Sequence, residues 1–233
     1  MSPRRPQNVW ITRAQPGADA TAQRVRALGH EPLVAPLLAV RPIEGVAIDL
    51  AGVGALAFTS ANGVRAFADA SPVRDLQVFS VGAATAQAAR AAGFRRVLSA
   101  DGDVNILAQG IVSRARELQG AVLHPGAAEL AGDLVGALAA RNVPARHLAL
   151  YETVAARLDR ETAARLAEMD AVLLHSPKAA TLLARRLRSS PLPNLRALGL
   201  SRAVTAPLAK VALAETAFAP LPLEAALLNL IDR

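Results

Sequence analysis

Short aliphatic runs alternate with amphipathic stretches along most of the chain, and this regular alternation limits the choice of fold more than any other feature. The aliphatic runs, predicted as strands, are NVWIT, EPLVA, ALAFT, QVFSV, RRVLS, AVLH, ARHLAL, AVLLH, LRALGL and TAFA. The amphipathic stretches, predicted as helices, are 17–28, 62–70, 84–92, 104–115, 128–140, 178–188, 202–212 and 222–231. Strands that alternate with helices predict parallel sheets covered by helices, which is an α/β fold.

The number of predicted strands and an internal repeat both indicate two domains. About ten strands are too many for one helix-covered sheet in 233 residues, so we expect two sheets of about five strands. ALAFTSANGVRAFA, from residue 55, aligns without gaps on AVLLHSPKAATLLA, from residue 171, and WITRAQPG lies opposite LHPGAAEL. Such self-similarity indicates a duplication. The extended segments 36–41 and 150–155, each in the middle of its repeat, are predicted to cross between the domains.

The composition excludes cysteine chemistry and leaves the cause of the arginine excess open. The chain has no cysteine, which excludes disulfides, thiolate metal sites and a thiol nucleophile. No apolar run has the length of a signal peptide or a membrane span, so we expect a soluble, cytoplasmic protein. The net charge of +7 comes from arginine, because only Lys178 and Lys210 are lysines. This excess favours an anionic ligand, but the codon usage of a GC-rich genome explains it equally well.

Small and polar residues follow several predicted strands, at the turns where the next helix begins. Thr59, Ser60 and Asn62 lie in one such turn, and Gly82 and Gly199 begin the related turns GAAT and GLSR. In doubly wound sheets, ligands bind at the carboxyl ends of the strands, where helix N-termini present free backbone amides. We interpret these side chains as helix caps and the amides beyond them as sites for an anionic oxygen, and the two roles are compatible.

The sequence lacks the common catalytic and cofactor motifs. It has no Walker loop, no GxGxxG and no GxSxG, so the main support for NTP binding, dinucleotide binding and serine-hydrolase chemistry is missing. No second histidine stands at metal-binding spacing from His124 or His175, so no zinc site is predicted. His30 and His147 are interpreted as structural or exposed. The few aromatic residues lie mostly in apolar contexts, which disfavours nucleic-acid binding.

Motifs in a fixed order along almost the whole chain resemble those of the uroporphyrinogen-III synthase family. They are TR after the first strand, Gly29 followed by PL, FTSANGV, VGAATA followed by AAG, HPGA, YET, HSPKA, and GLS ahead of AP. Each motif is short, and their order and spacing from Val9 to the C-terminus carry the resemblance. Arg202 departs from the family pattern, in which a small residue is more common there, and its role is left open.

The resemblance implies two flavodoxin-like, parallel-sheet domains joined by a two-stranded linker, with the active site in the cleft between the domains. Domain 1 would contain residues 1–35 and 156–233, domain 2 residues 42–149, and the linker strands residues 36–41 and 150–155. It also implies a lyase, a cyclising hydro-lyase that converts hydroxymethylbilane to uroporphyrinogen III with loss of water and inversion of ring D. The alternative that the residues leave open is a non-catalytic two-domain protein that binds an anionic small molecule.

The resemblance also implies site residues and ligands. Tyr151, the only tyrosine, is the candidate catalytic side chain, which would assist departure of the substrate hydroxyl as a hydrogen-bond donor or weak acid. Packing of its ring at a hinge is the alternative. The candidate substrate-binding residues are Thr12, Arg13, Ser60, Ala61, Asn62, Gly82, Thr85, Gly126, Ser176, Pro177, Lys178 and Ser201. We expect a monomer that binds a linear tetrapyrrole, with no metal, cofactor, nucleic acid or membrane as partner.

Overall fold

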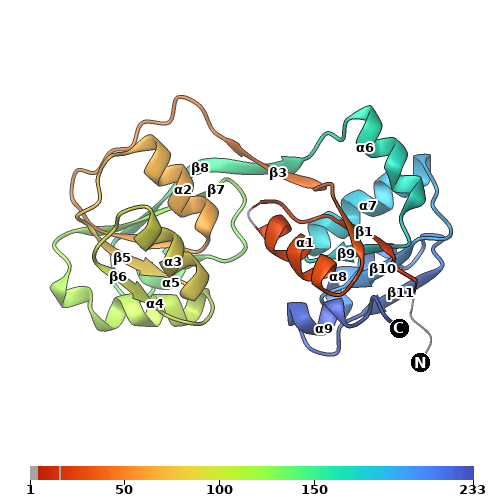
Figure 1. Ribbon diagram of the computed structural model, residues 1–233. Helices are drawn as coiled ribbons and strands as arrows, with labels where there is room; N and C mark the ends of the chain where they lie inside the picture. The colour runs from red at the N-terminus through yellow and green to blue at the C-terminus, as the bar shows by residue number, and fades with distance from the viewer. Residues whose placement is uncertain (1–4, 16) are drawn as a thin grey trace. The chain divides into compact units, whose positions relative to one another are not determined.

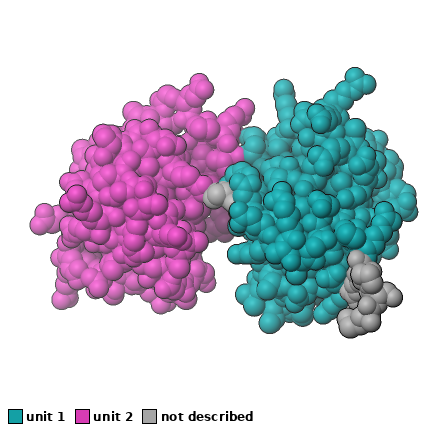
Figure 2. Space-filling model, viewed as in Figure 1, with its two compact units in different colours: residues 1–39, 154–233 teal, residues 40–153 magenta. Residues whose placement is uncertain are grey.

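The chain divides into two compact units. The computed structural model describes residues 5–15 and 17–233, so residues 1–4 and 16 of the expected domain 1 lie outside the described residues. Unit 1, teal in Figure 2, contains residues 1–39 and 154–233, and unit 2, magenta, contains residues 40–153. Each unit is built on one sheet with helices on both faces (Figure 1). Within the described residues, no helix has the length and apolar character needed to cross a bilayer.

Unit 1 contains a five-stranded parallel sheet in the order β2-β1-β9-β10-β11. Its strands are β1 (Asn8–Ile11), β2 (Glu31–Val34), β9 (Ala171–Leu174), β10 (Arg196–Gly199) and β11 (Glu215–Phe218). Numbered by their sequence within the unit, these strands read 2-1-3-4-5, which is the flavodoxin-like order. The predicted α/β fold class is therefore confirmed.

Helices cover both faces of this sheet because successive strand residues point to opposite sides. Val9 and Ile11 pack with α1 and α9, whereas Trp10 packs with α7 on the other face. The helices of unit 1 are α1 (Gly17–Ala27), α6 (Arg160–Arg165), α7 (Pro177–Ser189), α8 (Arg202–Thr205) and α9 (Glu224–Leu228), with 3₁₀ turns η2 (Leu166–Glu168) and η3 (Ala206–Leu208). The buried Trp10 indole donates a hydrogen bond to the carbonyl of Ala35 at 2.7 Å. The aliphatic strands predicted from the sequence thus form a core on each side of the sheet.

Unit 2 contains a six-stranded sheet in the order β3-β8-β7-β4-β5-β6, parallel from β8 to β6. Its strands are β3 (Leu38–Pro42), β4 (Val53–Phe58), β5 (Gln77–Ser80), β6 (Val97–Ser99), β7 (Ala121–Ala127) and β8 (Ala145–Ala155). The repeat in the sequence pairs β4 with β9 and β7 with β1, and the related turns that follow β5 and β10 pair these two strands. Strands β8 and β2 correspond because each is the next strand after β7 or β1. Under this correspondence the run β8-β7-β4-β5 matches β2-β1-β9-β10, so the topology agrees with the predicted duplication.

The helices of unit 2 also lie on both faces of its sheet. They are α2 (Ala61–Ala70), α3 (Ala83–Ala91), α4 (Val104–Ser113) and α5 (Leu134–Ala139), with a 3₁₀ turn η1 (Ala115–Glu117). On the face of α2 and α3, Phe58, Phe67 and Phe94 pack with neighbouring ring centroids about 6 Å apart. On the other face, α4 and α5 cover Ala55, Ala57 and other small strand residues. The small residues of the strands let these helices pack closely.

The chain passes between the units along a pair of antiparallel strands, β3 and β8. The amide of Ile43 donates to the carbonyl of Leu150 at 2.9 Å, and the amide of Ala156 donates to the carbonyl of Leu37 at 3.0 Å. The predicted strand ARHLAL and the second extended segment are one continuous strand, β8. The extra strand arises because β8 continues past its parallel neighbour β7 and pairs with β3.

Three predicted elements differ from the structure. The helix predicted over 128–140 begins only at Leu134, because the Asp133 side chain accepts from the amide of Gly136 and caps it there. The helix predicted over 202–212 is the short α8 followed by the 3₁₀ turn η3. The prediction missed α6, which Asp159 caps and which buries no residue of its own. A helix with no buried face leaves no apolar periodicity in the sequence.

Candidate active site

In both units, predicted site residues lie where the strand order reverses. In unit 1, the chain after β1 continues to β2 on one side, and the chain after β9 continues to β10 on the other. In unit 2, β7 and β4 stand in the same relationship. Ligands of doubly wound sheets bind at this switch point, outside the carboxyl ends of the strands. Thr12 and Arg13 follow β1, Ser176 follows β9 and Ser60 follows β4.

A pair of hydroxyl groups lies at the switch point of unit 2. The hydroxyl of Ser60 is 2.9 Å from the hydroxyl of Tyr151, and the same Ser60 oxygen caps α2 by accepting from the amide of Gly63 at 3.1 Å. Tyr151, on β8, is only 6% exposed. The ring is therefore buried, and its hydroxyl has a side-chain partner.

Two histidines face each other on neighbouring strands of the same sheet, and one of them contacts Thr59, the residue before Ser60. His124 and His147 are directly opposite each other on β7 and β8, with ring centroids 5.4 Å apart, and Nε2 of His124 is 3.1 Å from Oγ1 of Thr59. Burial and, to a smaller extent, the neighbouring His147 lower the pKa of His124 to about 4. Burial also lowers the pKa of His147. Both rings are therefore neutral at pH 7.

Sequence spacing could not reveal this histidine pair, because strand register brings the two residues together. His124 also lies within β7 rather than at its end, where it was expected. Within residues 5–15 and 17–233, no group of three or more histidine, aspartate or glutamate side chains is arranged to hold a metal ion.

Two glycines lie where strands of the unit 2 sheet end, and the space around them differs. A Cβ on Gly126 would lie 3.3 Å from Nε2 of both His124 and His147, so packing favours glycine there. Gly82 is the N-cap of α3, and a Cβ on it would meet no atom within 4 Å. The amide end of α3 is therefore uncovered. Thr85, one turn further along α3, is buried.

The turns of unit 1 repeat the capping seen in unit 2. Ser176 caps α7 by accepting from the amide of Ala179 at 3.2 Å, and Pro177 is the first residue of that helix. Thr12 is fully buried, and its hydroxyl donates to the carbonyl of Leu173 at 2.7 Å, which ties β1 to β9. Ser201 is the N-cap of α8, but its side chain makes no capping hydrogen bond.

The remaining candidates lie near these caps. Ala61 and Asn62 form the half-buried first turn of α2, and Lys178 is exposed in the first turn of α7. All three lie in helix first turns, where backbone amides have no partner within the helix.

A second polar group lies at the switch point of unit 1, around the carboxylate of Glu224. Its members, called the Glu224 cluster below, are Arg13, Thr21, Arg24, His175 and Glu224. Nη1 of Arg13 lies 3.3 Å from Oε1 of Glu224, and Nε2 of His175 lies 3.7 Å from the same oxygen. The Thr21 hydroxyl donates to Oε1, and the Arg24 guanidinium donates to Oε2. Glu224 was not among the site residues predicted from the sequence, because no motif marks it.

The Glu224 cluster has one excess positive charge at neutral pH. Burial and, to a smaller extent, the Arg13 charge lower the pKa of His175 to about 4, although Glu224 opposes this shift. Burial raises the pKa of Glu224, but the Thr21 hydroxyl and the nearby cations outweigh burial and lower it overall. His175 is thus neutral and Glu224 ionised, and the two arginines leave a net charge of about +1.

A comparison with family models identifies the chain. The model described as uroporphyrinogen-III synthase HemD matches residues 19–229. The chain belongs to the uroporphyrinogen-III synthase family. Membership of this family makes it an enzyme of tetrapyrrole biosynthesis, with the synthesis of uroporphyrinogen III as its function, and does not favour the non-catalytic alternative. A comparison with curated protein sequences found no significant match.

Solved structures of uroporphyrinogen-III synthases share the fold. The Helicobacter pylori enzyme is 17% identical, with a TM-score of 0.70 over 97% of this chain and 98% of that chain. A mutant enzyme from Thermus thermophilus is 19% identical, with a TM-score of 0.50 over 97% of this chain and 98% of that chain. At this level of identity the likeness concerns the fold alone.

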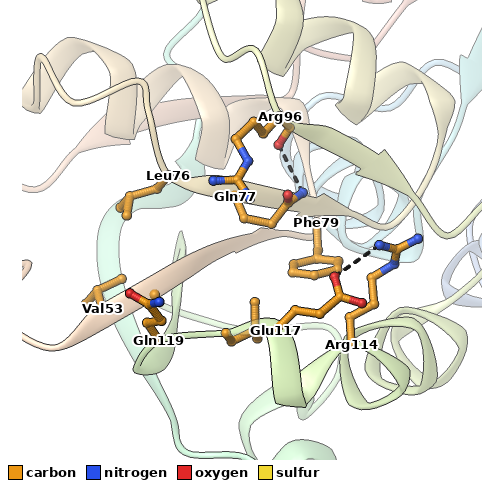
Figure 3. Close-up of a pocket in the computed structure, with 10 residues that line it drawn as sticks. Val53, Leu76, Gln77, Phe79, Arg96, Arg114, Glu117 and Gln119 are labelled. Carbon is orange, nitrogen blue, oxygen red and sulfur yellow. Dashed lines mark hydrogen bonds and ion pairs between the residues drawn. The ribbon is translucent and has the colours of Figure 1, made fainter.

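A pocket of about 320 Å³ lies at the other edge of the unit 2 sheet (Figure 3). Val53 and Gln77, the first residues of β4 and β5, line it together with Arg96, Arg114 and Glu117. Arg114 pairs with Glu117 at 3.3 Å, and the Gln77 side chain donates to the carbonyl of Arg96 at 3.1 Å. None of the predicted site residues lines this pocket, and it lies at the amino ends of the strands, where such sheets do not bind their ligands.

Proposed function

We propose that this chain is a cyclising hydro-lyase that converts hydroxymethylbilane to uroporphyrinogen III, with loss of water and inversion of ring D through a spirocyclic intermediate. The observation that carries the proposal is the contact between Ser60 and Tyr151 at a switch point, in a chain that belongs to this family. This contact supplies a positioned proton donor where the fold would bind a ligand.

Tyr151 is the proposed donor to the departing substrate hydroxyl. A serine hydroxyl has one proton and two acceptor sites. Ser60 accepts from the amide of Gly63, and it can at the same time donate its own proton to the oxygen of Tyr151. In that arrangement the Tyr151 proton is available for the substrate, whose hydroxyl leaves as water. Ser60 therefore orients the phenol. Its hydrogen bond also stabilises the Tyr151 oxygen while the phenol proton is shared with the leaving hydroxyl.

The substrate carries eight carboxylates, and we propose that backbone amides bind most of them. The first turns of α2, α3 and α7 contain the candidates Ala61, Asn62, Gly82, Pro177 and Lys178, and helix N-termini favour anionic oxygens. Arg13 and Lys178 add positive charge. Thr12 and the capping oxygen of Ser176 contribute by holding these turns in place.

Catalysis here depends mostly on orientation. Hydroxymethylbilane closes spontaneously to the uninverted type I isomer, so the enzyme must hold a reactive chain in one geometry. The test is to supply hydroxymethylbilane to the purified protein and to separate the type I and type III products by chromatography. We expect type III with the protein and type I without it. Type I alone in both samples would overturn the proposed function.

Several expectations from the sequence stay predictions. They are the boundaries of the two domains and of the linker strands, the assignment of the site residues, and an active site shared by the two domains. The cytoplasmic location, the monomeric state and the absence of nucleic acid as a partner also stay predictions.

A further inference from the structure

The guanidinium of Arg13 makes its hydrogen bonds through one nitrogen, Nη1. Nη1 donates to Oε1 of Glu224 at 3.3 Å and to Oγ1 of Thr21 at 3.4 Å. Nε and Nη2 make no hydrogen bond or ion pair with any residue in the described ranges 5–15 and 17–233. The side chain is 34% exposed. An arginine held in this way keeps the Nε–Nη2 edge for planar, two-point pairing with a carboxylate.

Glu224 is itself held in place. Thr21 and Arg24, one turn apart on α1, donate to its two carboxylate oxygens, and its side chain is only 20% exposed. The position of Glu224 is therefore determined by α1 and α9 together. A carboxylate fixed by other partners can determine where a flexible guanidinium lies.

Gly17 makes room for the guanidinium of Arg13. A Cβ added to Gly17 would lie 2.5 Å from Nη2 and 2.6 Å from Nε of Arg13, which is closer than real atoms approach. Any larger residue at this position must therefore move the guanidinium. Because the far end of a flexible side chain moves easily, such a change displaces Arg13 without disturbing the core.

We propose that Glu224 is a positioning residue, which holds Arg13 at the switch point of unit 1 so that the Nε–Nη2 edge of Arg13 binds one carboxylate of the substrate. The proposal rests on the proposed function, since that function supplies the polycarboxylate. Glu224 does not repel this carboxylate strongly, because the Glu224 cluster keeps an excess positive charge of about +1.

The experiment compares three single variants with the wild type. Glu224→Gln removes the ion pair, and Gly17→Ala moves Arg13 while leaving Glu224 intact. Glu215→Gln is the matched control, because Glu215 pairs with Arg196 at 2.7 Å at the amino edge of the same sheet. The measurements are KM and kcat for hydroxymethylbilane, the Kd for uroporphyrin III as an octacarboxylate probe, and the melting temperature.

We expect Glu224→Gln and Gly17→Ala to raise KM and the uroporphyrin Kd about three- to tenfold, with a much smaller change in kcat. Glu215→Gln should change neither KM nor Kd, and Gly17→Ala should keep the wild-type melting temperature. In an Arg13→Gln background, neither change should raise KM further, because its effect passes through Arg13.

Two results would overturn the role of Glu224. One is an unchanged KM and Kd in a folded Glu224→Gln variant, and the other is an increase that persists in full in the Arg13→Gln background. If the wild type forms no uroporphyrinogen III, the proposed function fails instead. The uroporphyrin Kd values of the same variants then still decide whether Glu224 positions Arg13.

Discussion

The hydroxyl of Tyr151 lies 2.9 Å from the hydroxyl of Ser60, and this contact links a strand that runs between the units to the cap of a helix in unit 2. Ser60 accepts a hydrogen bond from an amide of α2, and we propose that it also orients the phenol. The first two predictions separate these two roles.

Tyr151→Phe should lower kcat about 100-fold, which is the lower end of the contribution of a positioned proton donor. The ring stays packed, so the free energy of unfolding should fall by only about 1 kcal/mol, which is the net contribution of one hydrogen bond. Thr12→Ala and Thr85→Ala serve as comparisons and should lower kcat less. Steady-state kinetics with hydroxymethylbilane checks this, and an unchanged kcat in Tyr151→Phe would remove Tyr151 from the mechanism.

Ser60→Ala and Ser176→Ala should destabilise the protein by similar amounts, about 1 kcal/mol each, because both side chains cap a helix in the same way. Only Ser60→Ala also removes the partner of Tyr151, so it should reduce kcat several-fold more than Ser176→Ala. Urea unfolding and turnover of the two variants give the comparison. Equal losses of turnover would mean that Ser60 acts as a cap alone.

Gly82→Ala should impair substrate binding, whereas Gly126→Ala should lower stability. A methyl group at Gly82 meets no atom within 4 Å, so stability should change little, but the group would occupy the turn where we place a carboxylate, and KM should rise. A methyl group at Gly126 would press on His124 and His147, so the melting temperature should fall. Thermal unfolding and KM of the two variants distinguish these effects, and a destabilised Gly82→Ala would contradict the prediction.

Stability should fall as the pH drops from about 6.5 towards 4. Burial lowers the pKa of His124 from near 6.5 to about 4, so the unfolded chain binds a proton in this range and the folded chain does not. The stabilisation that comes from keeping His124 neutral is therefore complete above pH 6.5 and is lost below it. The free energy of unfolding should fall by about 2 kcal/mol between pH 7.5 and 5. Urea unfolding at these two pH values should show a smaller loss for His124→Gln than for the wild type. The same loss in both would mean that His124 does not titrate in this way.

The sequence predicted the elements whose signals are local. Helix α2 was expected at 62–70 and lies at Ala61–Ala70, because capping by Ser60 and the apolar spacing both stand in one short segment. The repeat predicted a duplication, and the matching run of strands in the two sheets agrees with it. The length of β8 was not predictable, since its last residues pair with a distant strand.

Candidate site residues could be named from the sequence, but the contacts between them could not. Ser60 and Tyr151 were both named, yet 91 residues separate them and only the sheet order brings them together. The pair of His124 and His147 depends on strand register, and the contact of Arg13 with Glu224 joins residues 211 positions apart. Such non-local contacts leave no periodicity or spacing in a single sequence.

The interruption of unit 1 by unit 2 in the chain has a consequence during translation. The strands β1 and β2 leave the ribosome before unit 2, but β9, the central neighbour of β1, follows only after all of unit 2. Unit 2 can therefore finish folding while one side of the apolar strand β1 still has no hydrogen-bonding partner. Unpaired apolar strands in nascent chains promote aggregation. Strand β1 is thus a segment of the nascent chain that needs protection from aggregation until β9 has been synthesised.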